Sequence, residues 1–533
     1  MVGLKNGSPE NQITAKKLLR FMTSAEAQTI LKESRYTLSA KKFEFNTMNS
    51  LLLRSLLTFT LLTSAVYALT TQDRILKPNA IVEYTKVPGE VDSLTKMLTQ
   101  GEIYGRLRSN NFWYNYEQSD VLDSDTFGVG GGIIYKSGYY HGVGATTGFY
   151  GSTTIGSDNT LCTETTCSNT TQAGKDLFRA GENGKEEAIG VFAVAYGEWK
   201  NHKTSLKAGR QMVETVLLSS NDAKMIPNTF EGFSIENSSV NDTSLKLGYL
   251  TQQKLRNHQN FHSVIAFQVK EENDDGASHK GLSVSKLQEA NKDVNPEIIF
   301  ATLTNQSLEN LKLYGEYVGI QGYFHTLIAE ANYAIILSDS WKLTPGIRYL
   351  QQFDDGAGAV GGAALSGLAS TTTAYNDPNN LDTSLINARV VLSNSIGSIA
   401  IGYSDVADKA DVIAPWRGFP TGGYTRAMAQ TNWYANTQSW MINGMVDFNK
   451  AQIIPGLICS ASYSYINIDD EKSNKLSIVS SDRNVVYADA IQTFSALPNT
   501  EFKFRFATVD SDTVLQLPNK SYTEYRFEIN YLF

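Results

Sequence analysis

The chain has 533 residues, a formal net charge of −8 and 19% charged residues, which is below the roughly 25% of a typical soluble domain. The acidic excess argues against a nucleic-acid binder, and three cysteines are too few for a disulfide framework or a four-cysteine zinc site. Tyrosine (27), phenylalanine (24) and glycine (41) are abundant while proline is scarce (12), and this composition favours a large β-structure with one polar and one apolar face.

An export signal precedes the main part of the chain. Residues 48–68 read MNSLLLRSLLTFTLLTSAVYA, with Arg54 as the positive region, an apolar core over residues 56–62 and an A-x-A-like cleavage site ending at Ala68. The apolar core is too short for a membrane anchor. We therefore predict a signal peptide over 48–68 and a mature chain that begins near Leu69.

Residues 1–47 lie upstream of this signal, where an exported chain should have nothing. Their pattern NGSPEN…AKKLLRFMTSAEAQTIL resembles the C-terminal tail of periplasmic solute-binding proteins. We interpret the segment as extraneous or fused. Either translation begins at Met48 or a neighbouring coding region has been joined on.

Residues 69–100 are too polar and irregular for membrane strands, so we expect a periplasmic N-terminal extension with a helical turn around residues 90–98. Beyond it, no run of 18 apolar residues occurs, and the side chains instead alternate with a period of two. In residues 501–506 three phenylalanines share one strand face while Lys503 and Arg505 share the other.

Roughly seventeen such segments of about ten residues can be marked, which is the length of a tilted strand across a bilayer. A half-buried sheet of a soluble protein also alternates, but the aromatic residues near the strand ends are typical of membrane barrels. Only a closed barrel pairs all backbone groups in lipid. We predict an all-β fold: a transmembrane antiparallel β-barrel over residues 101–533, with 18 strands, or 16 as the alternative.

Long polar segments punctuate the strands at residues 152–187, 218–241, 271–309, 351–382 and 404–430, and we expect them to be loops. The first contains Cys162 and Cys167, for which a small loop disulfide and two free thiols both remain open.

Two segments carry a family resemblance. LKAGRQMVETVLLSSNDAKMIPNTFEGFSIEN (206–237) resembles the third-loop region of the outer-membrane porin D (OprD-like) family of Gram-negative bacteria, and APWRGFPTGGYTRAMAQTNWYA (414–435) resembles a late loop of that family. The last strand, ending in Phe533, is similar to the signal read by the barrel assembly machinery. The resemblance implies an 18-stranded channel in the outer membrane, with inward-folded loops that narrow the pore.

The candidate pore residues are cations on the strand faces opposite the apolar ones, and rings of such charges set anion preference in pores. They are Arg106, Arg108, Arg210, Arg348, Arg389, Lys503, Arg505 and Arg526. We hypothesise that Arg210, Arg348 and Arg389 line the narrow zone and exchange the carboxylates of a solute. The alternative is ordinary lumen polarity, in which each cation pairs with a neighbouring acid such as Glu524 or Glu528.

The resemblance also implies that the loop carrying Asn221, Asp222 and Lys224 folds into the lumen as the constriction. We predict a porin for passive diffusion of small hydrophilic solutes, with outer-membrane lipid and those solutes as partners and no cofactor or metal. The identity and charge preference of the solute stay open, as does a monomer or a trimer. A non-conducting adhesin or structural barrel is the alternative, and a barrel hydrolase is less favoured because the sequence has no G-x-S-x-G, H-E-x-x-H or P-loop motif.

Overall fold

The computed structural model describes residues 74–85, 88–117, 123–157, 162–163, 166–167, 179–180, 186–222, 224–267, 281–365, 374–428, 430–469, 472, 482–512 and 521–533. The upstream segment 1–47 and the expected signal 48–68 lie outside these residues. In the described part of the chain, no helix is both long and apolar enough to span a bilayer.

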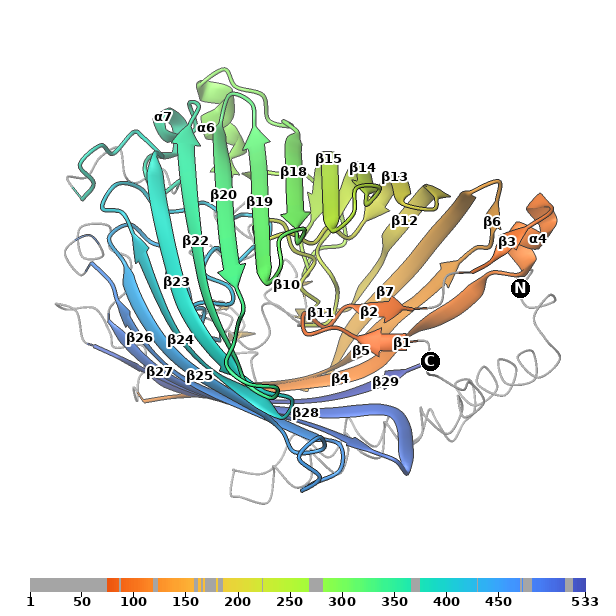
Figure 1. Ribbon diagram of the computed structural model, residues 1–533. Helices are drawn as coiled ribbons and strands as arrows, with labels where there is room; N and C mark the ends of the chain where they lie inside the picture. Colours follow the sequence, from red (N-terminus) through yellow and green to blue (C-terminus); the bar gives the residue numbers. More distant parts are fainter. Residues whose placement is uncertain are drawn as a thin grey trace.

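Eighteen antiparallel strands close into a barrel (Figure 1), which confirms the predicted fold and strand number. The first and last strands meet at the seam, where Arg526 lies opposite Phe112. The barrel strands are β4 (Glu102–Tyr116), β5 (Ser124–Lys136), β7 (Val143–Ser157), β12 (Ile189–Asn201), β13 (Thr204–Gln211), β14 (Thr229–Asn237), β15 (Thr243–Lys254), β18 (Ile298–Asn305), β19 (Leu311–Ile320), β20 (Phe324–Tyr333), β22 (Lys342–Asp354), β23 (Thr383–Ser393), β24 (Gly397–Val406), β25 (Gln438–Asp447), β26 (Leu457–Asn467), β27 (Arg483–Phe494), β28 (Leu497–Ser511) and β29 (Tyr522–Leu532).

The alternation seen in the sequence sets which side chains face lipid. In β28, Phe504 is 45% exposed on the outer face while its neighbour Arg505 is 8% exposed on the inner face. This agrees with the predicted division between phenylalanines and cations. The period of two follows from the strand itself, because successive side chains point to opposite faces of the sheet.

Short turns connect the strands at one end of the barrel. The C-terminal residue Phe533 lies at this end, where its carbonyl oxygen accepts from Gly105 N at 2.9 Å. Short turns of outer-membrane barrels face the periplasm, and long loops face outward. Two loop predictions were too long, since 218–241 includes β14 and 271–309 includes β18. The polar residues of β14 (TFEGFSIEN) resembled those of a loop, whereas β18 (IIFATLTN) is mostly apolar and the loop boundary was placed too far along the chain.

The smaller elements precede the first barrel strand or lie in the connections between strands. They are β1 (Arg74–Leu76), β2 (Val82–Tyr84), β3 (Glu90–Val91), α4 (Leu94–Thr99), β6 (Tyr139–Tyr140), β8 (Cys162–Thr163), β9 (Thr166–Cys167), β10 (Arg179–Ala180), β11 (Glu186–Glu187), β16 (Ala266–Phe267), β17 (Leu282–Ser283), α6 (Val284–Glu289), β21 (Ile335–Ile336) and α7 (Gly358–Gly361). Cys162 and Cys167 are cross-strand neighbours in β8 and β9, and a small loop disulfide and two free thiols both stay open.

The N-terminal extension differs from the expectation. The helical turn is present as α4, yet β1 and β2 form a short antiparallel hairpin, and this hairpin lies inside the barrel beside β4 and β29 (Figure 1). Ring stacking of Tyr84 on Tyr104, which is on the inner face of β4, holds it there. The sequence did not reveal this because three-residue strands leave no periodic signal.

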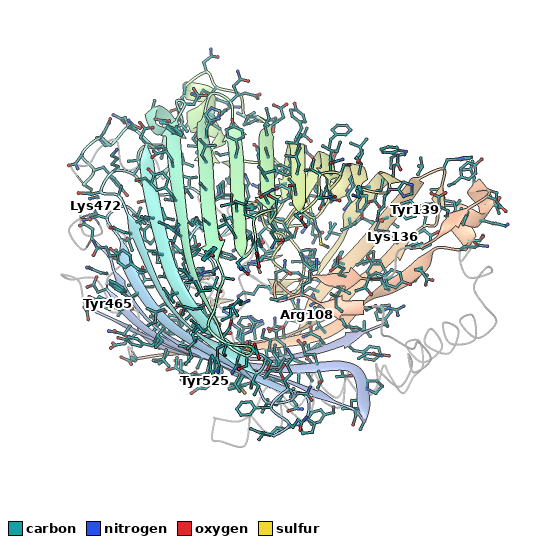
Figure 2. All side chains as sticks on the ribbon, viewed as in Figure 1. Arg108, Lys136, Tyr139, Tyr465, Lys472 and Tyr525 are labelled. Carbon is teal, nitrogen blue, oxygen red and sulfur yellow. The ribbon has the colours of Figure 1, made fainter. Side chains whose placement is uncertain are left out.

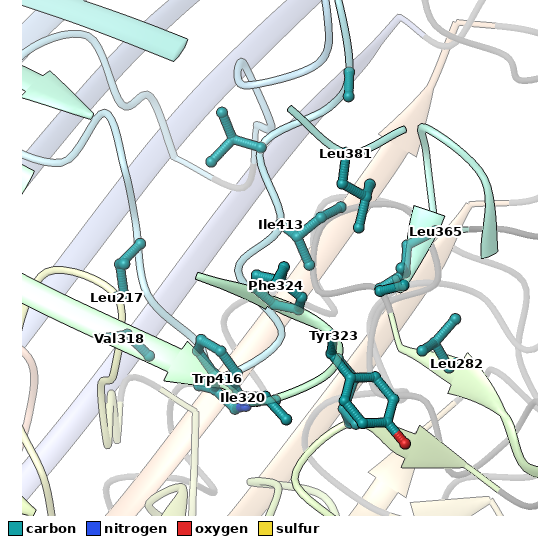
Figure 3. Close-up of a cluster of buried hydrophobic side chains, with 14 of the residues drawn as sticks. Leu217, Leu282, Val318, Ile320, Tyr323, Phe324, Leu365, Leu381, Ile413 and Trp416 are labelled. Atoms are coloured by element: carbon teal, nitrogen blue, oxygen red, sulfur yellow. The ribbon is translucent and has the colours of Figure 1, made fainter. Parts of the chain in front are cut away.

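The loops between strands fill part of the barrel with an apolar core of their own. Figure 3 shows Leu217 and Trp416, from two different loops, near Phe324 and Val318 of the barrel strands. The Trp416 indole stacks on Phe324 with 5.8 Å between the ring centroids. Burial of such aromatic and aliphatic side chains stabilises the loops in an inward position.

Candidate functional site: the constriction of the barrel

Two loops fold inward and meet inside the barrel. We call them the first inner loop (residues 212–228, between β13 and β14) and the second inner loop (residues 407–437, between β24 and β25). Ser219 N donates to Trp416 O and Phe419 N donates to Val216 O, both at 3.0 Å. These contacts join the loops edge to edge, so that they restrict the interior as one unit.

The tip of the first inner loop is tied to β4. The Asp222 carboxylate lies 2.5 Å from the Arg106 guanidinium and 3.2 Å from that of Arg108, and all three side chains are at most 3% exposed. Asn110 Nδ2 donates to the Lys224 carbonyl at 3.0 Å, and the Lys224 ammonium lies 4.2 Å from the ring centre of Phe112. The predicted loop residue Asp222 thus meets the predicted pore cations Arg106 and Arg108, while Lys224 contacts Asn110 and Phe112 of the same strand.

The base of the first inner loop is held by two buried charges that the sequence did not single out. Glu316 of β19 accepts from Thr215 Oγ1 at 2.6 Å and from the amides of Val216 and Leu217 at 2.9 and 3.1 Å. Lys254, at the end of β15, donates to Pro227 O at 2.8 Å. The loop is therefore braced on opposite sides of the barrel.

The shape of the tip is consistent with its residues. Asn221 has a positive φ of 28°, a conformation that asparagine tolerates better than most residues. Its side chain is 8% exposed. The turn places the next residue, Asp222, against β4.

The second inner loop is held by Arg348 and Arg389 of β22 and β23. Arg348 donates to the carbonyls of Pro420 and Gly422 at 3.0 and 3.1 Å, and Arg389 donates to Gly423 O at 2.7 Å. Both guanidinium groups lie under 5 Å from the Tyr424 ring centre, at 4.8 and 4.7 Å. Two of the three cations predicted for the narrow zone are thus neighbours.

Arg210, the third, is not brought to this place. It pairs with Glu231 at 3.0 Å, lies 4.4 Å from the Phe261 ring centre, and is 41% exposed. In β13 it shares a strand face with Leu206, which is 42% exposed on the outside of the barrel. The spacing of four between these two residues was a signal that the face assignment of Arg210 overlooked.

The remaining predicted cations gather around the seam of the barrel, where Arg108 is labelled in Figure 2. Each has an acidic partner: Glu528 lies 3.0 Å from both Arg108 and Arg505, Lys503 lies 3.4 Å from Asp489, and Arg526 forms a hydrogen bond with Glu524. Glu524 and Glu528 therefore act as the neighbouring acids that were weighed as the alternative. The inner face at the seam carries paired charges rather than a row of isolated cations.

Among the described residues, no group of three or more histidine, cysteine, aspartate or glutamate side chains is arranged to hold an ion.

Comparison with known proteins shows which family model and which solved structures the chain resembles. A family model described as "outer membrane porin, OprD family" matches residues 110–533. Among solved structures, Pseudomonas aeruginosa OpdK with vanillate is similar at 14% identity and a TM-score of 0.60, with 81% of this chain and 98% of that chain covered. Acinetobacter baumannii OccAB1 is similar at 14% identity and 0.63, covering 81% and 96%. No curated protein sequence matches the chain.

Proposed function

Since the chain belongs to the OprD family of outer membrane porins, we propose that its two joined inner loops select among the small hydrophilic solutes that diffuse through the barrel. The observation that carries this proposal is the bracing of the first inner loop on β4, β15 and β19, together with its edge contact to the second inner loop. A loop that is fixed to strands on opposite sides of the barrel gives the constriction a defined shape.

We propose carboxylates as the preferred solutes and Arg389 as the residue that contacts them. Arg389 is partly exposed, and its two acceptors, Gly423 O and Asn332 Oδ1 (2.8 Å), are neutral. A carboxylate bond to a guanidinium is roughly twice as strong as a neutral one, so a solute carboxylate can displace these acceptors. Arg108 is buried between two acids and cannot exchange in this way. The similar OpdK was solved with vanillate, which is a carboxylate.

The test is single-channel conductance in a planar bilayer with a salt gradient. Wild type, Arg389→Gln and the matched control Arg210→Gln are compared, with an aromatic monocarboxylate added as a probe. We expect steady conductance in all three, and a loss of anion preference and of probe-induced current interruptions in Arg389→Gln alone. If the folded wild-type barrel shows no conductance, the porin function is contradicted. Equal behaviour of both variants would contradict the role of Arg389.

We also propose that assembly depends on the last strand. Phe533 exchanges two backbone hydrogen bonds with Gly105 across the seam, at 2.9 and 3.1 Å. Deleting Phe533 should reduce the fraction of heat-modifiable, assembled barrel relative to wild type, and an unchanged fraction counts against the proposal. Native mass spectrometry of the purified barrel distinguishes monomer from trimer.

For the N-terminal region we propose cleavage near Leu69 and absence of residues 1–47 from the mature protein. Intact-mass measurement of the exported protein tests both. A mature product that retains residues 1–47 contradicts the proposal.

A further inference from the structure

We propose that the β1–β2 hairpin, residues 74–84, is a second selectivity element, which narrows the lumen on the periplasmic side of the first inner loop and holds that loop through Asn79. The inference rests on the proposed diffusion function. It adds a specificity-determining segment that the family match does not cover, because that match begins at residue 110.

The position of the hairpin follows from its contacts with the barrel. β1 lies next to β29 and β2 lies next to β4. The Tyr84 ring stacks on Tyr104 with 5.1 Å between centroids and 19° between planes. Tyr104 shares its strand face with Arg106, whose guanidinium reaches Asp222 inside the barrel. The hairpin therefore stands against the inner face at the seam.

The tip of the hairpin reaches the constriction itself. Lys77 N donates to Ile81 O at 2.9 Å and Ala80 N donates to Lys77 O at 2.7 Å, which closes a tight turn. From this turn, Asn79 Nδ2 donates to the Glu214 carboxylate at 2.8 Å, and Ala80 and Ile81 are 6% and 8% exposed. The turn is thus packed under the first inner loop rather than free in the channel.

Glu214 links the hairpin to the shape of the loop. Its carboxylate also accepts from Ser220 N at 2.7 Å and from Ser219 Oγ at 3.3 Å. Burial raises the pKa of this carboxyl group because it disfavours the charged form. The hydrogen bonds from Asn79, Ser219 and Ser220 oppose this effect, since they stabilise the carboxylate. Loss of Asn79 removes a donor from the group that fixes residues 219 and 220, and Ser219 is one of the residues that join the two loops.

The hairpin depends on the barrel for its structure, which argues for a fixed obstacle. Strands of three residues are not stable alone in water. The contacts with Tyr104 and Glu214 therefore fix the hairpin, and two contacts within it add to them: the Lys77 ammonium lies 2.8 Å from Glu83, and the Arg74 guanidinium lies 5.5 Å from the Tyr84 ring centre. A fixed segment inside the lumen reduces the cross-section through which ions and solutes pass.

The test places a cysteine on the hairpin. Lys77 has a 42% exposed side chain, so Lys77→Cys is accessible to a small sulfonate-bearing methanethiosulfonate. Lys96 of α4, with a side chain that is 48% exposed at the turn end of the barrel, provides the matched control Lys96→Cys. Wild type controls for the native cysteines. We expect a loss of single-channel current on labelling Lys77→Cys, its recovery with dithiothreitol, and no change in the two controls.

Asn79→Ala is the second variant, for which we expect increased open-channel noise and conductance. If Lys77→Cys resists labelling, or is labelled by intact mass without a loss of current, the hairpin is not in the ion path and the inference is wrong. Wild-type conductance in the same experiment keeps this outcome distinct from a failure of the porin proposal.

Discussion

Removal of the Asp222 carboxylate is the most direct perturbation of the constriction. In Asp222→Ala, Arg106 loses the carboxylate that lies 2.5 Å away, while Arg108 keeps Glu528 at 3.0 Å. Removing one partner of a buried ion pair costs about 3–5 kcal/mol. At 1.4 kcal/mol per factor of ten, the equilibrium between docked and undocked loop tip shifts by about two to three and a half powers of ten.

The effect should be local, because Lys254 and Glu316 still hold the base of the loop. We expect a folded, heat-modifiable barrel with a larger single-channel conductance, more open-state noise and a reversal potential shifted toward anion preference, since two guanidinium groups lose a compensating charge. The control is Asp242→Asn in the exposed turn after β14, where the residue has a positive φ of 54° that asparagine tolerates equally. Wild-type conductance and noise in Asp222→Ala would refute the reasoning.

Three further outcomes follow from the structure. Phe504→Lys, at the middle of β28 and facing lipid, should destabilise the barrel by about 2–4 kcal/mol in a urea titration, whereas Lys503→Gln on the inner face should cost less. Lys254→Met leaves the Pro227 carbonyl without its donor, at a cost of about 1–3 kcal/mol, and should speed amide exchange at residues 224–226 and 228 with little change in the midpoint of unfolding. The Gly322 amide lowers the pKa of Asp355, so this contact contributes above about pH 4 and is lost as the pH falls through the lowered value; protection of the Gly322 amide, corrected for the intrinsic pH dependence of exchange, should fall across this acidic range, and Asp355→Asn should abolish the fall.

The barrel could be predicted from the sequence because lipid and water impose a local rule on each strand. Residues 501–506 show this rule directly. Their phenylalanines face outward and Lys503 and Arg505 face inward in the structure, as the alternation predicts. The rule also contained the information that Arg210 shares a face with Leu206. The prediction that Arg210 lies on the face opposite the apolar residues was therefore wrong, because an even spacing along a strand puts it on the same face as Leu206.

The constriction could be predicted only in part. The resemblance placed Asp222 and Lys224 in an inward loop, but Glu316 and Lys254 gave no signal, because their partners are backbone groups of a loop distant in sequence. Nothing in a strand pattern specifies where a loop docks. The hairpin at residues 74–84 was missed for the same reason: its position depends on Tyr104 and Glu214, and its three-residue strands are too short to show a period of two.

The pairing of charges at the seam has a consequence for selectivity. An isolated guanidinium buried inside the barrel would be costly, and an acid such as Glu528 offsets that cost for Arg108 and Arg505. The same acid cancels much of the field that a passing solute would feel. The proposed selectivity for a carboxylate therefore requires cations whose hydrogen-bond acceptors are neutral, and the acceptors of Arg389 beside the second inner loop, Gly423 O and Asn332 Oδ1, are neutral. A count of basic residues on the inner face overestimates the anion preference of such a pore.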